Sequence, residues 1–204
     1  SKKFNMSISQ KLINNENNGD HPKQKTDRWY DIRQSMLTAS EVASVLDCNI
    51  FQTSYDLLIK KISPVENKNS IATEWGNLFE PIAINLYEHI TNVTVYSLGL
   101  VTHSKYNWLG ASPDGLIMSG RLLEIKCPIS RTIGKCIPLY YWIQMQIQME
   151  VCNINVCDYF ECEFYKYSNI DEYESDISKE SNKRLSNNSI NFGTIKPEKS
   201  SVEN

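Results

Sequence analysis

The sequence predicts an α/β fold in which a small mixed β-sheet is flanked by helices. Apolar residues recur every three or four positions over residues 72–90, which indicates a long amphipathic helix. Two short apolar runs on either side of Ser119-Gly120 indicate a β-hairpin. Residues 138–152 are apolar on nearly every side, so they predict a buried helix. This mixture of helices and strands along one chain is typical of α/β domains.

The length and composition indicate one domain with polar ends. The chain has 204 residues, of which 41% are hydrophobic, enough for one ordinary core. Residues 1–26 are polar and turn-rich, so we expect a flexible N-terminal arm. Residues 27–168 form the predicted folded domain, and residues 169–204 the predicted polar C-terminal helix and tail.

The helices before the hairpin have recognisable limits. Helical spacing begins near Asp27, and Thr38 with Glu41 three residues later has the arrangement of a capping box. A further helix is expected over residues 54–62. The long helix contains Glu80 followed by Pro81, and a proline inside a helix removes a backbone donor and often produces a kink. Strands are expected over residues 94–102 and 156–165.

The charge and the apolar runs limit the functional class. The net charge is −3, whereas nucleic-acid binders usually carry a basic excess. The acidic residues gather near residues 171–176 while lysines and arginines lie in the body, so the composition permits a DNA substrate without deciding it. No apolar run is long enough to span a membrane, and the N-terminal residues lack the apolar stretch of a secretory signal. We therefore expect a soluble, intracellular protein with no membrane partner.

The six cysteines are expected to be reduced, because most lie within apolar runs of a chain without an export signal. Cys152, Cys157 and Cys162 are five residues apart, which would place them on alternating faces of a strand. That spacing is unfavourable for zinc, and a metal or iron–sulfur role for the three stays the alternative.

The predicted hairpin brings a set of charged residues together. Pro113 and Gly115 place Asp114 in a turn at the mouth of the hairpin, and Glu124 lies on the returning strand. Lys126 follows two positions later, so its side chain leaves the same face as that of Glu124. Two carboxylates and one ammonium would meet at one point, which suits a divalent cation and a water beside it.

Each of these charged residues also has a structural interpretation. A Glu and a Lys two apart on a strand commonly form a solvated face with cross-strand pairs. Here both lie within the apolar run L-L-E-I-K-C-P-I, which favours a chemical role. Glu80 could equally be an exposed helical glutamate or a carboxylate presented by a kink.

Several motifs in order resemble one nuclease family. They are W-Y-D-I-R, T-A-S-E, W-G-N-L-F-E, S-P-D-G-L, E-I-K-C-P and Y-W-I-Q-M-Q, between residues 29 and 164. The set is similar to the PD-(D/E)XK nuclease superfamily, and within it to the phage lambda exonuclease, or YqaJ-type viral recombinase, family. The resemblance implies a restriction-endonuclease-like core with the active site at the sheet edge.

The resemblance also implies the roles of individual residues. Asp114, Glu124 and the carbonyl of Ile125 would bind one Mg²⁺, and Glu80 would serve a second ion, with Mn²⁺ able to substitute for Mg²⁺. Lys126 would position or deprotonate the attacking water. Gln146 would orient the nucleophile or the scissile phosphate, in preference to Gln144.

By the same resemblance, Arg33 and Ser40 would hold a terminal 5′-phosphate, with Ser112 at a nearby phosphate. The implied activity is Mg²⁺-dependent hydrolysis of duplex DNA from 5′ ends, for viral recombination or DNA processing in the host cell of a DNA virus or phage. A single-strand annealing protein and a homotrimer are the implied partners. The alternatives are a related endonuclease or RecB-like nuclease of different polarity, and a non-catalytic module that binds DNA ends.

Overall fold

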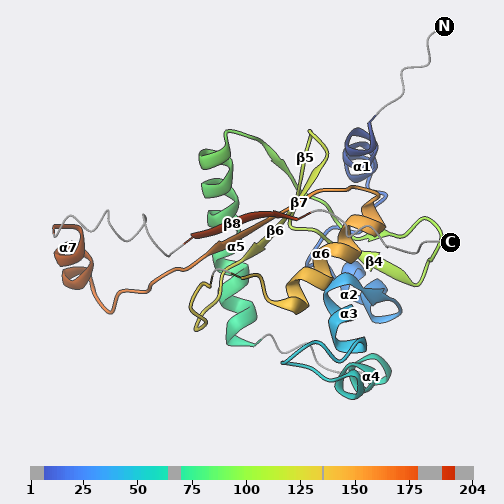
Figure 1. The fold of residues 1–204 in the computed structure, drawn as a ribbon, viewed down its shortest axis with the longest axis horizontal. Helices are drawn as coiled ribbons and strands as arrows, with labels where there is room; N and C mark the ends of the chain where they lie inside the picture. Colours follow the sequence, from blue (N-terminus) through green and yellow to red (C-terminus); the bar gives the residue numbers. More distant parts are fainter. Residues whose placement is uncertain (1–6, 64–69, 135, 179–189, 196–204) are drawn as a thin grey trace, which may run out of the picture.

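The structure, a computed structural model, describes residues 7–63, 70–134, 136–178 and 190–195 (Figure 1). The helices are α1 Ile8–Asn17, α2 Asp27–Gln34, α3 Ala39–Val45, α4 Ser54–Ile62, α5 Ile71–Thr91, α6 Leu139–Cys152 and α7 Ile170–Ser178. The strands are β1 Leu37–Thr38, β2 Val95–Tyr96, β3 Val101–Thr102, β4 Leu109–Ala111, β5 Gly115–Ile117, β6 Arg121–Lys126, β7 Cys157–Cys162 and β8 Ile190–Ile195.

The strands of the described chain form two small mixed sheets. The larger has the order β2-β5-β6-β7-β8, in which β6 and β7 run parallel and the other neighbours run antiparallel. The smaller has the order β1-β4-β3, with β1 parallel and β3 antiparallel to β4. The predicted α/β class with a mixed sheet is therefore confirmed, although the strands divide between two sheets.

The hairpin at the centre of the larger sheet has the predicted form. β5 and β6 pair antiparallel, with Leu116 opposite Leu122. The turn between them places Gly120 at φ +89°, a conformation that residues with a side chain rarely adopt. Leu116, Leu122 and Leu123 are fully buried, so the hairpin contributes to the core on both of its faces.

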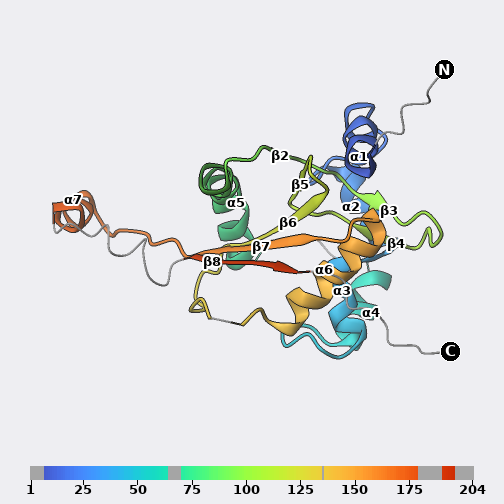
Figure 2. The same cartoon turned by 45° about the horizontal axis from the view of Figure 1, so that its top comes forward.

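The two faces of the central strands pack against different helices (Figure 2). On one face, Met145 of α6 belongs to the same buried cluster as Leu122 and Tyr159. On the other face, Tyr87 of α5 packs with Phe160. Side chains that alternate along β6 therefore point toward α6 or toward α5, and the site residues lie on the α6 side.

A buried charge network joins α5 to the sheet. Asp158 on β7 is fully buried and accepts a hydrogen bond of 2.5 Å from the Tyr87 hydroxyl. The Arg121 guanidinium, at the start of β6, donates to both oxygens of the same carboxylate. Because an unpaired buried carboxylate would be strongly destabilising, these donors are needed to keep Asp158 inside the protein.

The prediction that residues 1–26 form a flexible arm is wrong for residues 8–17, which form α1 with Ser7 as its N-cap. Leu12 and Ile13 of this helix are buried in the main hydrophobic cluster. Pro22 lies so close to Gly99 that a Cβ there would come within 2.3 Å of the Pro22 carbonyl oxygen. The reason for the error is that two apolar residues in a polar segment do not stand out until the surface that buries them is known.

Two further segments differ from the sequence prediction. The expected strand over residues 94–102 is interrupted, with β2 and β3 belonging to different sheets. Residues 190–195 were assigned to the polar tail but form β8, which pairs antiparallel with β7. The expected helix within that C-terminal region is α7. The rest of the predicted tail lies outside the described residues.

The cysteines agree with the expectation of reduced thiols, because all six are free. Cys152, Cys157 and Cys162 are buried, and burial raises the pKa of each thiol. Among the residues that the structure describes, no helix combines the length and the apolar character needed to cross a bilayer.

Candidate active site

The structure brings the predicted charged triad together at the mouth of the hairpin. Asp114 lies between β4 and β5, and its Oδ2 accepts a hydrogen bond of 2.6 Å from the backbone N–H of Ile125. Glu124 and Lys126 extend from one face of β6, and the Lys126 ammonium donates to Glu124 Oε1. The two acids therefore come from opposite arms of the hairpin, as the spacing predicts.

The electrostatics of this group indicate a site that favours an added positive charge. Glu124 is fully buried. Burial and then the Glu124 carboxylate raise the pKa of Asp114 well above its ordinary value, while Lys126 acts in the opposite direction. Burial lowers the pKa of Lys126, but the nearby carboxylates of Glu124 and Asp114 outweigh that effect and raise it overall. Two carboxylates in one buried place repel each other, and a cation between them would relieve that repulsion.

Two amides from α6 hold Glu124 in place. Gln144 Nε2 donates to Glu124 Oε1 at 2.6 Å, and Gln148 Nε2 donates to Oε2 at 2.7 Å. The predicted role of Gln146, to orient the nucleophile or the scissile phosphate in preference to Gln144, stays a prediction, while the amide bonds to Glu124 come from Gln144 and Gln148. Gln144 and Gln148 are one turn apart and share a helix face, whereas Gln146 projects from the other side of α6.

Glu80 lies at the margin of the acidic pair that Asp114 and Glu124 form. It raises the pKa of Asp114 electrostatically, so its carboxylate is within range. Its Oε2 forms an ion pair with the Lys25 ammonium at 3.2 Å. In the described part of the chain, no group of three or more His, Cys, Asp or Glu side chains is close enough to hold a metal. The arrangement therefore offers Asp114 and Glu124 as one pair and leaves Glu80 engaged with a lysine.

The donor set fits one hard divalent cation. Carboxylate and carbonyl oxygens are the ligands that Mg²⁺ uses in proteins, and it usually keeps several waters beside one or two carboxylates. Asp114 and Glu124 supply that number of carboxylates. The Ile125 carbonyl as a third ligand, and Glu80 as a ligand to a second ion, stay predictions.

A cavity of about 150 Å³ next to this pair gathers the predicted phosphate-binding residues. Its lining consists of Gln24, Trp29, Arg33, Ala39, Ser40, Ser112, Gln144 and Gln148. The Arg33 guanidinium donates to Ser40 Oγ at 3.2 Å. The volume corresponds to about five water molecules, which suits a phosphate group better than a nucleoside.

Two residues that the sequence interpretation missed organise this cavity. The Trp29 indole N–H donates to Ser112 Oγ at 2.9 Å, and the Arg33 guanidinium lies 4.2 Å from the centre of the Trp29 ring. Gln24 donates to the carbonyls of Leu98 and Pro113, the latter directly before Asp114. The sequence interpretation used Trp29 only as part of the motif W-Y-D-I-R, and Gln24 lies in the segment that was expected to be a flexible arm.

The comparison with known protein families decides the classification. Residues 28–155, well over half of the chain, match the model of the YqaJ-like viral recombinase domain. The chain belongs to this family. The matched range contains every predicted site residue of this YqaJ-like domain as well as Trp29, Gln144 and Gln148.

Viral proteins and a solved exonuclease are similar to this YqaJ-like domain. A protein of Acanthamoeba polyphaga mimivirus is 34% identical over 78% of this chain and 32% of its own length. A protein of African swine fever virus (strain Badajoz 1971 Vero-adapted) is 31% identical over 62% of this chain and 46% of its own length. The chain thus spans less than half of either relative.

The crystal structure of an alkaline exonuclease from Laribacter hongkongensis has the same fold, with a TM-score of 0.62 and 24% identity. That likeness covers 85% of this chain and 83% of the exonuclease. The resemblance to the YqaJ-type viral recombinase family is therefore confirmed by the family match, and the predicted fold is confirmed by the likeness to this solved structure.

Proposed function

We propose that the protein is a Mg²⁺-dependent exonuclease that hydrolyses one strand of duplex DNA from its 5′ end, in viral recombination or DNA processing. The observation that carries this proposal is that the acidic pair, Asp114 and Glu124, and the cavity beside it share two residues of α6. Gln144 and Gln148 line the cavity that holds Arg33 and Ser40, and the same two amides hold Glu124. A terminal phosphate in the cavity would lie beside the acidic pair.

The lining of the cavity supports a preference for a 5′-phosphate end. A terminal phosphate carries up to two negative charges, and a planar guanidinium can donate to two of its oxygens at once. Arg33 supplies that group, and the Ser40 and Ser112 hydroxyls supply neutral donors around it. The small volume admits the phosphate and keeps the first base outside.

The proposed chemistry divides among the chain's own residues. Asp114 and Glu124 would hold the metal, which supplies charge neutralisation at the phosphate and activates a water. Lys126 would position that water as an ammonium beside Glu124, or deprotonate it once a bound cation offsets the carboxylates that raise its pKa. Gln144 would orient Glu124, and through it the reacting phosphate. Glu80 would join a second ion only after Lys25 releases it.

The test is hydrolysis of end-labelled linear duplexes in Mg²⁺, with a phosphate or a hydroxyl at the 5′ end. Wild-type protein should release nucleotides from phosphorylated ends, and Asp114→Ala and Lys126→Ala should abolish that release. Arg33→Ala should reduce the rate on phosphorylated ends more than on hydroxyl ends. Undiminished digestion by either active-site variant would refute the site assignment, and equal loss on both ends would remove the 5′-phosphate claim.

The same substrates separate the alternatives. Cutting of closed circular duplex would indicate a related endonuclease, and release from 3′ ends would indicate a nuclease of the other polarity. Binding of ends with no hydrolysis in Mg²⁺ or Mn²⁺ would indicate a non-catalytic end-binding module. The intact set of Asp114, Glu124 and Lys126 favours an enzyme over that last alternative.

Two partners belong to the same proposal. A single-strand annealing protein would take up the strand that digestion leaves, and a homotrimer would enclose the duplex. Light scattering of the purified protein would test the trimer, and co-purification with the annealing protein would test the partnership.

A further inference from the structure

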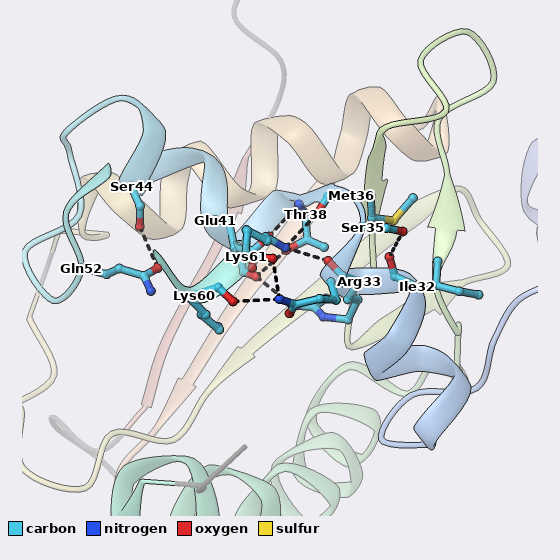
Figure 3. Close-up of polar contacts among 12 residues, drawn as sticks. Ile32, Arg33, Ser35, Met36, Thr38, Glu41, Ser44, Gln52, Lys60 and Lys61 are labelled. Carbon is cyan, nitrogen blue, oxygen red and sulfur yellow. Dashed lines mark hydrogen bonds and ion pairs between the residues drawn. The ribbon is translucent and has the colours of Figure 1, made fainter. Parts of the chain in front are cut away.

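A lysine outside the cavity connects α4 to the elements that carry its anion-binding residues (Figure 3). The Lys61 ammonium lies 2.9 Å from Glu41 Oε2 and donates to the backbone carbonyls of Arg33 at 2.7 Å and Met36 at 2.8 Å. Its side chain is only 19% exposed. Because the Lys61 ammonium has three oxygen partners and little contact with solvent, those partners fix its position.

The two carbonyls lie at the C-terminal end of α2, the helix that carries Trp29 and Arg33: Arg33 is in its last turn, and Met36 follows it. α2 ends at Gln34, and the carbonyls of its last turn have no partners within the helix. A cation at this end is favourable because the helix dipole is negative there. Lys61 therefore anchors the backbone of Arg33 itself, one side chain away from the cavity.

The third partner, Glu41, is a buried carboxylate at the start of α3 and is only 6% exposed. Its Oε2 accepts hydrogen bonds from the Thr38 backbone N–H at 3.0 Å and the Thr38 hydroxyl at 2.8 Å. The bond from the Thr38 backbone is one half of the capping box that the sequence predicts, at the start of the helix whose first turn contains Ser40. Lys61 is the basic side chain that pairs with this carboxylate.

Glu41 is also within electrostatic range of Arg33. Burial lowers the pKa of Arg33 while the Glu41 carboxylate acts to raise it, so the two charges attract each other. Arg33 nevertheless donates to Ser40, at the cavity wall. A guanidinium that turned onto Glu41 would be lost to an incoming phosphate, because a carboxylate competes for the same donors.

We propose that Lys61 is a positioning residue for the 5′-phosphate cavity: it neutralises Glu41 and so keeps Arg33 directed at the anion. This inference rests on the proposed function of the cavity. Lys61 touches neither DNA nor metal in this account. It acts through Glu41 and through the backbone of Arg33.

The experiment compares KM for linear duplexes with 5′-phosphate and 5′-hydroxyl ends, in Mg²⁺, for the wild-type chain and four variants. Lys61→Met removes the ammonium, and Lys61→Arg retains the charge. Lys60→Met is the matched control, because it removes the same charge from the neighbouring exposed position of α4. Lys61→Met combined with Glu41→Gln removes both charges, and a glutamine can still complete a capping box.

Lys61→Met should reduce the preference for phosphorylated ends by about 10- to 100-fold, the factor for losing one charge-assisted hydrogen bond. Lys60→Met and Lys61→Arg should retain that preference. The double variant should recover it, because no unpaired carboxylate then competes for Arg33. The double variant also leaves no unpaired buried charge. It can therefore still be measured if Lys61→Met alone does not fold.

The possible results separate this inference from the function on which it rests. If wild-type protein shows no preference for phosphorylated ends, the proposed function of the cavity fails first. If wild-type protein shows the preference and Lys61→Met retains it, Lys61 does not position Arg33. If the double variant loses the preference as fully as Lys61→Met, the neutralisation of Glu41 is not the cause. A loss with Lys60→Met equal to that with Lys61→Met would reduce the effect to general surface charge.

Discussion

Replacing Gln144 tests whether the amides of α6 support the reaction by holding Glu124. Gln144→Met keeps the size of the side chain and removes the donor that lies 2.6 Å from Glu124 Oε1. Hydrogen bonds to charged groups contribute about 1.5–3 kcal/mol, and the partial exposure of Gln144 favours the lower end. A loss of about 1.5 kcal/mol corresponds to a reduction of about tenfold in rate.

The assay is single-turnover release of nucleotides from a 5′-phosphorylated duplex at saturating Mg²⁺. Gln146→Met is the matched control, since it makes the same change two residues away on the other side of α6. It should slow the reaction less than Gln144→Met does, because the amide bonds to Glu124 come from Gln144 and Gln148. The reasoning is refuted if Gln146→Met slows the reaction more than Gln144→Met does.

Three further predictions follow from the described contacts. Trp29→Phe keeps the aromatic face 4.2 Å from Arg33 but removes the donor to Ser112. KM for phosphorylated ends should therefore rise about fivefold, as expected for the loss of one neutral hydrogen bond of about 1 kcal/mol. Trp29→Ala should raise KM further, and equal effects of the two variants would show that the ring contributes nothing. Tyr87→Phe should lower the free energy of unfolding by about 1.5–3 kcal/mol, because Asp158 loses one of its donors, whereas Tyr55→Phe at a 68% exposed position should change it little in urea titrations. Since the folded-state pKa of Asp114 is raised, its contribution to stability without metal is present below the ordinary aspartate pKa and is lost as the pH rises through the raised value. Melting temperatures measured against pH should show this loss in EDTA but not in saturating Mg²⁺, and a loss that persists in Asp114→Asn would assign it to another group.

The hairpin was predictable because its signals are local. Ser119-Gly120 requires a tight turn, and the positive φ of Gly120 fits that requirement. Strand alternation then places Glu124 and Lys126 on one face, and the turn around Asp114 fixes the third group. Each step depends on residues close in sequence, so the triad followed without knowledge of the rest of the fold.

The partners of the triad were not predictable in the same way. All three glutamines of α6 lie in one apolar run, and only the rotation of α6 against β6 decides that Gln144 and Gln148 face Glu124. Gln24 reaches Pro113 because the segment that follows α1 lies against the body, where Pro22 packs on Gly99. These are consequences of tertiary packing, which local periodicity does not contain.

The C-terminal strand shows the same limit. The sequence I-N-F-G-T-I alternates apolar and polar residues at its start, the pattern of a strand with one buried face. The strand was not predicted because this pattern is short and lies within a polar segment. The strand acquires its structure from the edge of β7, to which it adds.

The most direct test of the account is the position of a divalent cation in a crystal of the protein grown with Mn²⁺ and a 5′-phosphorylated duplex. We expect an anomalous peak for one ion coordinated by both Asp114 and Glu124, with the terminal phosphate against Arg33. A manganese ion bound elsewhere, or carboxylates of Asp114 and Glu124 that share no ion, would contradict it.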